Sequence, residues 1–437
     1  MSNNISEICK DNLCISCGLC TTICQMDAIS YIRKRGMYVP SISDKCINCG
    51  KCLRVCPGKG CDYPELWKAC KTKIPDNPWI GNFLDAFSVK TKNKKTLMNS
   101  TSGGVVTSLV QMLLNLGIYD SAFLVEGYNY EKAISTVRKT KLDDLIDTGK
   151  SRYIPIMHTK SVEYIINNPG ERVILVGTSC FFEAFLRIVD LLKLDRNNYF
   201  LIGLFCDRTM NYNVFLYFKL FNSEKKLNKL YFRTKEPNGW PGDVRLIYED
   251  GTDQVLSRRE RMKVKDYFVP ERCLYCLDKL NQFADISIGD NYIKGQEDKE
   301  GSSIVIVRSK NAGDYLSEEL FEIKPASIED ICKCQGIENR EERLAFQDFK
   351  KSNELIRNNN IFSYDTNNIQ KYRLKYEEIM KKLRAGEEDS CVEIKKYVEE
   401  TELRAKKDNK QSFIHQIIVK LHDISERDNL LPKFFRK

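Results

Sequence analysis

Eighteen cysteines are the most unusual chemical feature of this 437-residue chain, which contains only three histidines. Eight of the cysteines lie in two short segments, LCISCGLCTTIC at 13–24 and KCINCGKCLRVCP at 45–57. Both segments have the spacing CxxCxxCxxxC, and Pro57 closes the second copy. Thiolates at this spacing bind 4Fe-4S clusters, which accept and release single electrons. The two segments therefore predict an electron-transfer function.

The pairing of these cysteines follows from the spacing of bacterial two-cluster ferredoxins. Three close cysteines of one segment bind one cluster, and the fourth begins a helix that reaches the cluster of the other segment. Gln25 stands where a proline usually follows, a minor departure. A structural zinc site would be one tetrahedral four-ligand set, so zinc is the weaker alternative. We expect one cluster on Cys14, Cys17, Cys20 and Cys56, and the other on Cys46, Cys49, Cys52 and Cys24.

Four more cysteines come from three separate places in the later sequence. Cys180 follows ERVILVGTS, Cys206 ends YFLIGLFC, and Cys273 and Cys276 form a CxxC motif. Four thiolates are enough to bind a third 4Fe-4S cluster. Cysteine is also among the most buried residue types, so ordinary core cysteines are the alternative.

The other chemically notable residues receive no assignment. We expect Cys9, Cys61, Cys70 and Cys391 to be free thiols, whereas Cys332 and Cys334 form a CxC motif without companions. We expect the three histidines to be structural or exposed: His158, His415 and His422.

The elements that position these cysteines are indicated by their apolar patterns. Four apolar runs predict buried strands, and VRLIYEDGTDQVL predicts a hairpin that turns at Asp250 and Gly251. The sequence therefore predicts an α+β (mixed α/β) fold with a mixed sheet. The predicted strands lie at 171–177, 199–206, 284–290 and 302–309.

A helix is predicted from the apolar spacing in STSGGVVTSLVQMLLNLG, and Gly117 is placed to end it. Ser102, Gly103 and Gly104 stand at its start. Free backbone amides and the helix dipole suit such a start to a phosphate group. The same residue types also cap helices that bind nothing, so this alternative stays open.

Four regions are expected along the chain. A two-cluster ferredoxin domain is expected at 1–62, a linker at 63–96, a mixed-sheet domain with the third cysteine set at 97–336, and a charged helical extension at 337–437. The extension includes KYRLKYEEIMKKLRAGEEDS, and it either docks a partner or packs on its own domain. Its last part predicts an amphipathic helix with Phe413, Ile414, Ile417, Ile418 and Leu421 on one face.

The net charge of +9 counts every cysteine as neutral. Each 4Fe-4S cluster with four thiolates carries roughly −2, so three clusters would cancel about six of these charges. The basic run KTKNKK at 90–95 is therefore interpreted as a solvated linker, since no nucleic-acid-binding motif accompanies it. No apolar run is long enough to span a membrane, and no signal peptide is evident, so a cytoplasmic location is expected.

The later motifs together resemble the family of coenzyme F420 hydrogenase/dehydrogenase beta subunits. The similarity covers about residues 5–325 and includes STSGGVVTSLV, KSRYI, VGTSC, GLFC, GWPG, RCLYCLDKLNQFADISIGD and GSSIVIVRS. The resemblance implies a flavin, FAD rather than FMN, beside a 4Fe-4S cluster, with hydride exchanged between the flavin and coenzyme F420. Ferredoxin segments in the same chain look most like the electron-input subunit of dehydrogenases that oxidise reduced coenzyme F420.

The resemblance also implies roles for individual residues. Cys180, Cys206, Cys273 and Cys276 match the family's cluster ligands. Thr178 is implied to lie near the flavin ring, whereas Asp285 is as well explained as a strand cap. An ordinary turn and strand start is the alternative for KSRYI. The implied flavin contacts are Ser102, Gly103, Gly104, Ser151, Arg152, Tyr153, Thr178, Asn281 and Asp290.

Two departures from the family pattern affect the substrate. The usual GTPCQ is GTSCF, with Ser179 and Phe181, and the usual FCHG is FCDR, with Asp207 and Arg208. Reduced coenzyme F420 is therefore a candidate hydride donor beside other carriers, and ferredoxin or a partner subunit is the expected one-electron partner. The direction of electron flow and the oligomeric state stay open.

Three alternatives to this function are weighed. The first is a bacterial-type family member that acts on an unknown substrate, for example in polysaccharide biosynthesis. The second is a flavin-free electron-transfer or scaffold subunit. The third is a zinc-rich nucleic-acid binder, whose binding would depend strongly on salt.

Overall fold

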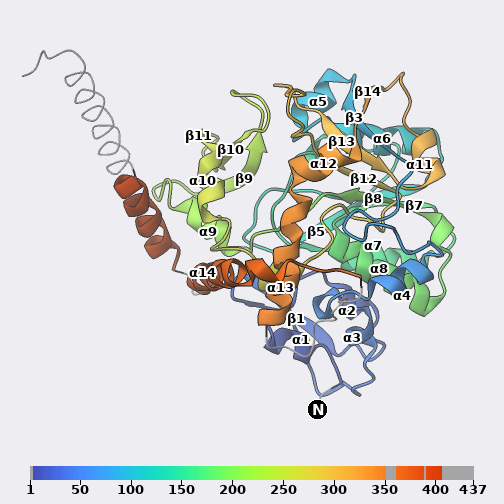
Figure 1. Cartoon of the computed structure of the whole chain (residues 1–437), viewed down its shortest axis with the longest axis horizontal. Coiled ribbons are helices and arrows are strands. Elements are labelled where there is room, and N and C mark those ends of the chain that lie inside the picture. The colour runs from blue at the N-terminus through green and yellow to red at the C-terminus, as the bar shows by residue number, and fades with distance from the viewer. Residues whose placement is uncertain (1–2, 351–360, 388–389, 406–437) are drawn as a thin grey trace, which may run out of the picture. The chain divides into compact units, whose positions relative to one another are not determined.

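The computed structural model describes residues 3–350, 361–387 and 390–405 (Figure 1). The chain divides into two compact units, residues 1–389 and 390–437. The described part of the second unit is helical at 391–405. The predicted apolar face at Phe413, Ile414, Ile417, Ile418 and Leu421 lies outside the described residues, as do His415 and His422.

The N-terminal region contains both ferredoxin-like segments and a small hairpin. Helices α2 (Leu19–Thr22) and α3 (Lys51–Val55) each begin at a glycine with positive φ, Gly18 and Gly50, directly after the second cysteine of a segment. Glycine adopts this backbone conformation without steric cost. Strands β1 (Ile29–Lys34) and β2 (Met37–Ile42) pair antiparallel, and the short helix α1 (Ser6–Lys10) precedes the first segment.

A nine-stranded mixed sheet forms the centre of the larger unit. Its order is β14-β3-β13-β12-β8-β7-β4-β5-β6, and β12, β8, β7 and β4 run parallel to one another. The predicted α+β fold with a mixed sheet is therefore confirmed. The strands are β3 (Asp85–Thr91), β4 (Ser121–Val125), β5 (Ile134–Lys139), β6 (Ile156–Met157), β7 (Val173–Gly177), β8 (Tyr199–Leu204), β12 (Ile286–Asp290), β13 (Ser303–Val307) and β14 (Phe321–Pro325).

A second sheet contains the predicted hairpin. Strands β10 (Asp243–Tyr248) and β11 (Asp253–Leu256) pair antiparallel across a turn in which Gly251 has positive φ. Strand β9 (Leu227–Thr234) pairs with the other side of β10. The hairpin prediction is confirmed.

Residues 63–96, for which the sequence predicts a linker, are built into the fold. They form helix α4 (Tyr63–Ala69) and strand β3, which pairs with both β13 and β14 inside the main sheet. The basic run at 90–95 belongs to β3 and to helix α5 (Lys94–Asn99). Lys90 is only 16% exposed and pairs with Asp298 at 2.9 Å, so it does not belong to a solvated linker.

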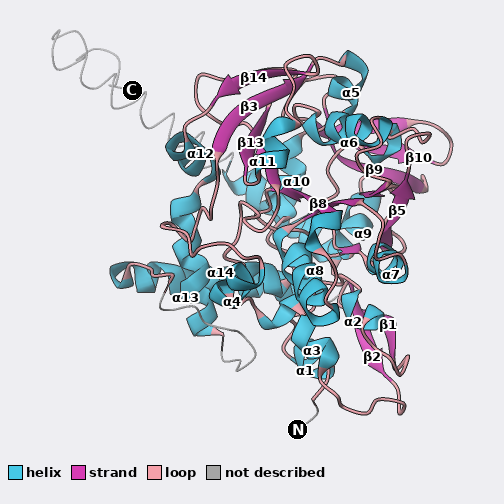
Figure 2. Cartoon of the chain, turned by 90° about the vertical axis from the view of Figure 1, so that its right-hand side faces the viewer, coloured by secondary structure: helices cyan, strands magenta, loops and turns pink. Residues whose placement is uncertain are grey.

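Helices cover both faces of the main sheet (Figures 1 and 2). Alternate side chains of each strand point to opposite faces, so β7 sends Val173 and Leu175 into one apolar cluster and Ile174 into another. Helix α6 (Val105–Asn115) packs in the second cluster and ends before Gly117, as predicted. The remaining helices are α7 (Thr159–Asn167), α8 (Ser179–Leu192), α9 (Asn213–Lys219), α10 (Arg258–Val264), α11 (Lys310–Asp314), α12 (Ile328–Gln335), α13 (Glu341–Phe349) and α14 (Ile369–Glu387).

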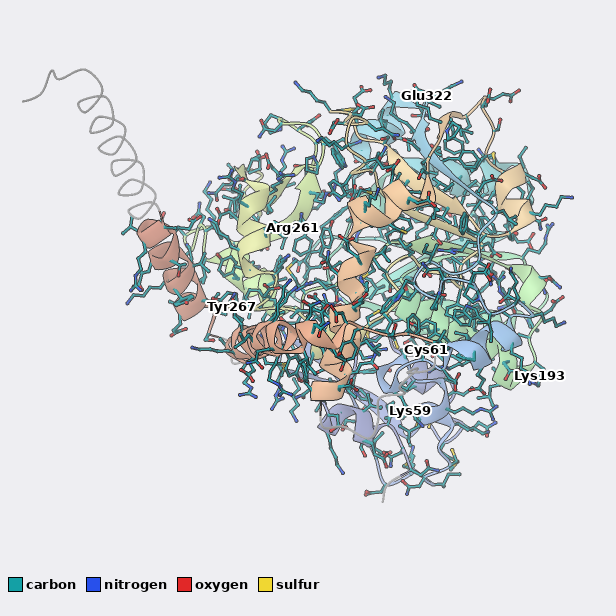
Figure 3. All side chains as sticks on the ribbon, in the orientation of Figure 1. Lys59, Cys61, Lys193, Arg261, Tyr267 and Glu322 are labelled. Carbon is teal, nitrogen blue, oxygen red and sulfur yellow. The ribbon has the colours of Figure 1, made fainter. Side chains whose placement is uncertain are left out.

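Helix α8 joins the sheet to the N-terminal region. Its buried Phe182, Phe185 and Ile188 belong to the same apolar cluster as Val55 of α3 and Leu66 of α4. Figure 2 shows α8 between the sheet and the N-terminal helices, and Figure 3 marks Cys61 beside them. A continuous core therefore fixes the two cysteine-rich segments against the sheet domain.

Candidate redox site

Four cysteines of the ferredoxin-like segments line one cavity of about 280 Å³. Cys24 follows α2, Cys52 lies in α3, and Cys46 and Cys49 come from the loop before α3. The cavity thus brings together the three close cysteines of the second segment and the last cysteine of the first. Cys49 is exposed, so this group reaches the protein surface.

The other four cysteines of the segments form a more enclosed group. Burial raises the pKa of Cys20 to about 12 and that of Cys56 to about 11. Burial and the neighbouring Cys56 and Cys20 sulfurs also raise the pKa of Cys17. Cys14 interacts with the Cys20 sulfur, so all four thiols face one another. A buried group of thiols favours thiolates only when a cationic centre binds them, and iron supplies such a centre.

The described cysteine groups do not have the geometry of a single-ion site. In the described part of the chain, no three His, Cys, Asp or Glu side chains could hold one metal ion together. Tetrahedral zinc requires four ligands, with thiolate sulfurs about 2.3 Å from the metal. The expectation of 4Fe-4S clusters in the two segments rests on the cysteine spacing CxxCxxCxxxC.

The third cysteine group lies at the carboxyl edge of the parallel strands. Cys180 is in the first turn of α8, directly after β7, and Cys206 follows β8. Cys273 and Cys276 come from a 3-10 segment, Glu271–Tyr275, and from the residue after it. Burial and the Cys273, Cys180 and Cys276 sulfurs raise the pKa of Cys206, so the structure brings the four thiols together.

Two predicted flavin contacts lie beside this third group and hold its loops. Thr178 Oγ1 lies 3.3 Å from the Cys180 sulfur. Asn281 is fully buried, and its Nδ2 donates to the carbonyls of Gly177 at 2.9 Å and Leu204 at 3.3 Å. Asn281 thus ties together the ends of β7 and β8, which precede Cys180 and Cys206. These contacts give Asn281 a structural role, because they hold the two loops that contain Cys180 and Cys206.

The third group adjoins the first group of ferredoxin-like cysteines. Cys180 contributes to the raised pKa of Cys17, after burial and the Cys56 and Cys20 sulfurs. The backbone amide of His158 donates to the Cys17 carbonyl at 2.8 Å, and its ring stacks on Phe181 at 3.6 Å. Phe181 directly follows Cys180, so these contacts connect one group to the other.

Two cations strengthen this junction. Arg187 of α8 donates to the carbonyls of Cys56 at 2.8 Å and Gly60 at 2.6 Å. Arg272, in the segment before Cys273, donates to the Pro57 carbonyl at 3.0 Å. Sequence reasoning singled out neither arginine, since each acts through backbone carbonyls and belongs to no spacing motif.

The predicted flavin loop lies at the same edge of the sheet. Gly103 donates its backbone amide to Ser303 Oγ at 3.0 Å, and a Cβ atom at Gly103 would lie only 2.5 Å from the Val89 carbonyl oxygen. Gly104 has positive φ and precedes α6. The Ser151 backbone amide donates to Thr101 Oγ1 at 2.7 Å. The two predicted segments therefore lie side by side.

A polar cluster surrounds this loop. Arg233 forms a bidentate ion pair with Asp290, at 2.6 and 3.0 Å, and also donates to the Tyr153 hydroxyl at 3.2 Å. Trp240 donates to the same carboxylate at 3.1 Å, and the nearby Ser102 hydroxyl donates to the Ser302 carbonyl at 2.5 Å. Although burial opposes ionisation, Arg233 and these donors lower the pKa of Asp290. The structure thus brings Ser102, Tyr153 and Asp290 together.

More cations lie around the polar cluster. Lys235 donates to the carbonyls of Leu97 at 2.6 Å and Ser102 at 2.7 Å, and burial lowers its pKa to about 8. Arg261 of α10, which Figure 3 labels, places its guanidinium 4.5 Å from the centre of the Tyr153 ring. Sequence reasoning missed Arg233, Lys235 and Arg261, because a single basic residue in a strand or helix gives no motif.

The Arg152 side chain points away from the polar cluster, unlike that of Tyr153. Its guanidinium donates to the carbonyls of Gly127, Thr148, Gly149, Lys150 and Asp147. The side chain is therefore committed to shaping its own loop. It supports Ser151 and Tyr153 without pointing to the polar cluster.

Three family models match the chain in sequence. The coenzyme F420 hydrogenase/dehydrogenase beta-subunit models match residues 86–163 for the N-terminal part and 170–328 for the C-terminal part. A 4Fe-4S dicluster domain matches residues 13–60. The described helices include none that is long and apolar enough to cross a membrane.

Similar proteins come from methanogens. An uncharacterised protein of Methanocaldococcus jannaschii is 24% identical over 70% of this chain and 86% of its own length. A coenzyme F420-dependent sulfite reductase of that organism is 24% identical over 82% of this chain, which spans only 52% of the reductase. One subunit of the F(420)H(2) dehydrogenase of Methanosarcina mazei is 23% identical over 66% of this chain and 78% of its own length.

Proposed function

Because this chain belongs to the family of coenzyme F420 hydrogenase/dehydrogenase beta subunits, we propose that it is a flavin- and iron–sulfur-dependent oxidoreductase. It would pass electrons between a hydride carrier, FAD, three 4Fe-4S clusters and an external one-electron partner. Our first candidate for the carrier is reduced coenzyme F420, and the external partner would be ferredoxin or a partner subunit. Two relatives are themselves named for coenzyme F420 or its reduced form.

The adjacency of the three cysteine groups carries this proposal. The group at Cys180 adjoins Cys17 of the first ferredoxin-like group, and Cys20 of that group interacts with Cys52 of the second. Cys49 of the second group is exposed. Single electrons would thus enter at the carboxyl edge of the sheet, cross the first group and leave from the second.

The flavin would be held by the loop at Ser102–Gly104 and by the polar cluster around Asp290. A flavin supplies exchange between two-electron hydride chemistry and one-electron transfer to clusters. Gly103 lets the loop pack against the Val89 carbonyl and Ser303, which a side chain there would prevent, and Tyr153 offers an aromatic ring whose hydroxyl accepts a hydrogen bond from Arg233. Hydride transfer needs no protein acid or base, so these residues bind and orient the reactants.

The chain's own departures from the family pattern lie around the third cysteine group. Phe181 is 1% exposed and stacks on His158, so it faces the first group. Asp207 and Arg208 form ion pairs with each other, and Arg208 also pairs with Asp266. These positions border the proposed redox site, so they could change which substrate binds there. Our second candidate is therefore a bacterial-type family member that acts on another substrate.

Anaerobic purification followed by iron and flavin analysis tests the cofactor content. The proposal predicts about twelve iron atoms per chain, four for each of three clusters, together with bound FAD. Reduced coenzyme F420, NADH, NADPH and reduced ferredoxin are then compared as reductants. Full iron without flavin would favour the flavin-free electron-transfer subunit, and reduction by another carrier alone would favour the second candidate.

A further inference from the structure

Two buried arginines lie beyond the matched family models, which end at residue 328. Arg340 ends the 3-10 segment Ile337–Arg340, and Arg343 lies in the first turn of α13. Their side chains are only 3% and 2% exposed. Arginine is rarely buried to this extent without anionic or carbonyl partners. Their partners therefore indicate what they do.

Both arginines bind the backbone of the third cysteine group. Arg340 donates to the Cys206 carbonyl at 2.9 Å and to the Cys276 carbonyl at 3.2 Å. Arg343 donates to the Cys273 carbonyl at 3.3 Å. Three of the four cysteines, from two separate loops, are thus fastened by one short segment.

Further side chains of the same helix face continue this contact. Gln347, four residues after Arg343, donates to the Tyr275 carbonyl at 2.9 Å. Lys350 pairs with Glu271 at 2.6 Å. Residues spaced by three or four lie on one face of a helix. One face of α13 therefore covers the segment from Glu271 to Cys276.

Asp207 connects the arginines to a departure from the family motif. It occupies the position after Cys206 where the family has histidine, and its carboxylate lies 3.4 Å from Arg340 and 3.7 Å from Arg343. Both guanidinium groups lie within 4 Å of this carboxylate, so Asp207 is a shared anionic partner of the two arginines. The departure and the C-terminal segment thus form one charge network.

This network leaves a role for a further anion. Three guanidinium groups share the Asp207 carboxylate, Arg208 at 2.9 Å, Arg340 at 3.4 Å and Arg343 at 3.7 Å, and Arg343 also lies 3.9 Å from Glu342. A 4Fe-4S cluster with four thiolates carries roughly −2 and becomes more negative on reduction. Buried cations beside such a cluster stabilise its reduced form most.

We propose that the segment 337–350 is an integral part of the third cluster site, in which Arg340 and Arg343 position the Cys206, Cys273 and Cys276 loops and raise the cluster's reduction potential. The inference rests on the proposed third cluster. It adds two positioning residues that the family motifs do not include. These residues act through carbonyls and charge and do not touch the iron.

The test is an EPR-monitored redox titration of the full-length, anaerobically purified protein. In Arg343→Gln we expect the equilibrium constant for one-electron reduction of the third cluster to fall about tenfold. This change lowers the reduction potential of the cluster by about 59 mV. Arg343→Lys keeps the charge and should restore most of that potential. Asp207→Asn removes a negative charge and should shift the potential upward.

Arg373→Gln is the matched control, since Arg373 is an exposed residue of α14 that stacks on Phe349. It should leave all potentials unchanged. The two ferredoxin clusters serve as an internal control for folding.

Arg343→Gln could fail to assemble the third cluster while the two ferredoxin clusters stay intact. In that case the positioning role is supported if Arg340→Lys and Arg343→Lys both retain the third cluster, and it is refuted if they lose it. An unchanged potential and iron content in Arg340→Gln and Arg343→Gln would overturn the inference. Wild-type protein with about eight iron atoms would instead overturn the proposed third cluster itself.

Discussion

At the residue scale, a tyrosine hydroxyl lies beside a ligand sulfur of the first cysteine group. The Tyr31 hydroxyl lies 3.2 Å from the Cys20 sulfur, and the Ser16 backbone amide donates to the Cys14 sulfur at 3.4 Å. Burial and the Cys20 sulfur raise the pKa of Tyr31, so its hydroxyl stays protonated and can donate. Hydrogen bonds to cluster sulfurs help to set the reduction potential. Cys9, for which the sequence predicts a free thiol, neighbours Cys14 and donates to the Pro40 carbonyl at 3.7 Å.

We predict that Tyr31→Phe lowers the reduction potential of the first cluster, because one donor to a ligand sulfur is lost. Loss of about 1 kcal/mol would correspond to roughly a fivefold change in the reduction equilibrium. Tyr38→Phe is the matched control, since that hydroxyl donates to the Glu131 carbonyl instead. An EPR-monitored titration in which both variants match the wild type would contradict the prediction.

His158 gives a prediction for pH dependence. Burial lowers its pKa to about 3, whereas the unfolded chain has the ordinary value near 6.5. The unfolded state therefore binds more protons between these values, and the stability contributed by neutral His158 is lost as the pH falls. At pH 5.5 the loss is about 1.4 kcal/mol relative to pH 7.5. In denaturant unfolding, the free energy of unfolding of His158→Phe should change by about 1.4 kcal/mol less between pH 7.5 and pH 5.5 than that of the wild type. An equal change in both proteins would show that His158 is not the buried neutral group described here.

The Arg233–Asp290 pair gives a second prediction at this scale. Arg233→Met leaves Asp290 without its bidentate partner in a buried position. Breaking such a pair costs about 3 to 5 kcal/mol. We expect lower stability and loss of flavin on purification with the ferredoxin clusters retained. Normal flavin content with unchanged urea unfolding would contradict this role.

At the element scale, the cysteine-rich segments and the apolar strands could be predicted because each has a local pattern. The spacing of Cys14 to Cys24 and the runs around Val173 and Ile304 depend on neighbouring residues alone. Strand β3 was not predicted, since the charged residues on either side of it gave the appearance of a linker. Its place between β13 and β14 is set by pairing with distant strands, which no local pattern shows.

The helix start at Gly103 can be tested at this scale. Gly103→Ala would place a methyl group 2.5 Å from the Val89 carbonyl oxygen, so β3 or the loop must move. We predict loss of flavin and a destabilisation of about 1 to 3 kcal/mol from overpacking. Gly170→Ala is the control, because nothing lies within 4 Å of a Cβ atom there. Equal flavin content and thermal stability in the two variants would contradict a flavin-binding role for the loop at Gly103.

At the scale of the whole molecule, helix α8 joins the carboxyl edge of the sheet, where we propose the third cluster, to the domain that matches the 4Fe-4S dicluster model. The first turn of this helix contains Cys180 of the third group, and its Arg187 contacts the first group. The C-terminal segment with Arg340 closes the other side of the third group. The sequence predicted an extension from residue 337 onward, but its first helix contributes to the site. Such contacts between distant segments depend on tertiary packing, so the cysteine spacing alone could not reveal them.

The central claim is that two-electron reduction at the sheet edge delivers single electrons to the ferredoxin clusters. The most direct measurement is EPR of the anaerobic wild-type protein after addition of reduced coenzyme F420. We expect signals from reduced 4Fe-4S clusters, together with loss of the oxidised flavin spectrum. The claim would be contradicted if dithionite reduces the clusters but reduced coenzyme F420, NADH and NADPH all leave them oxidised.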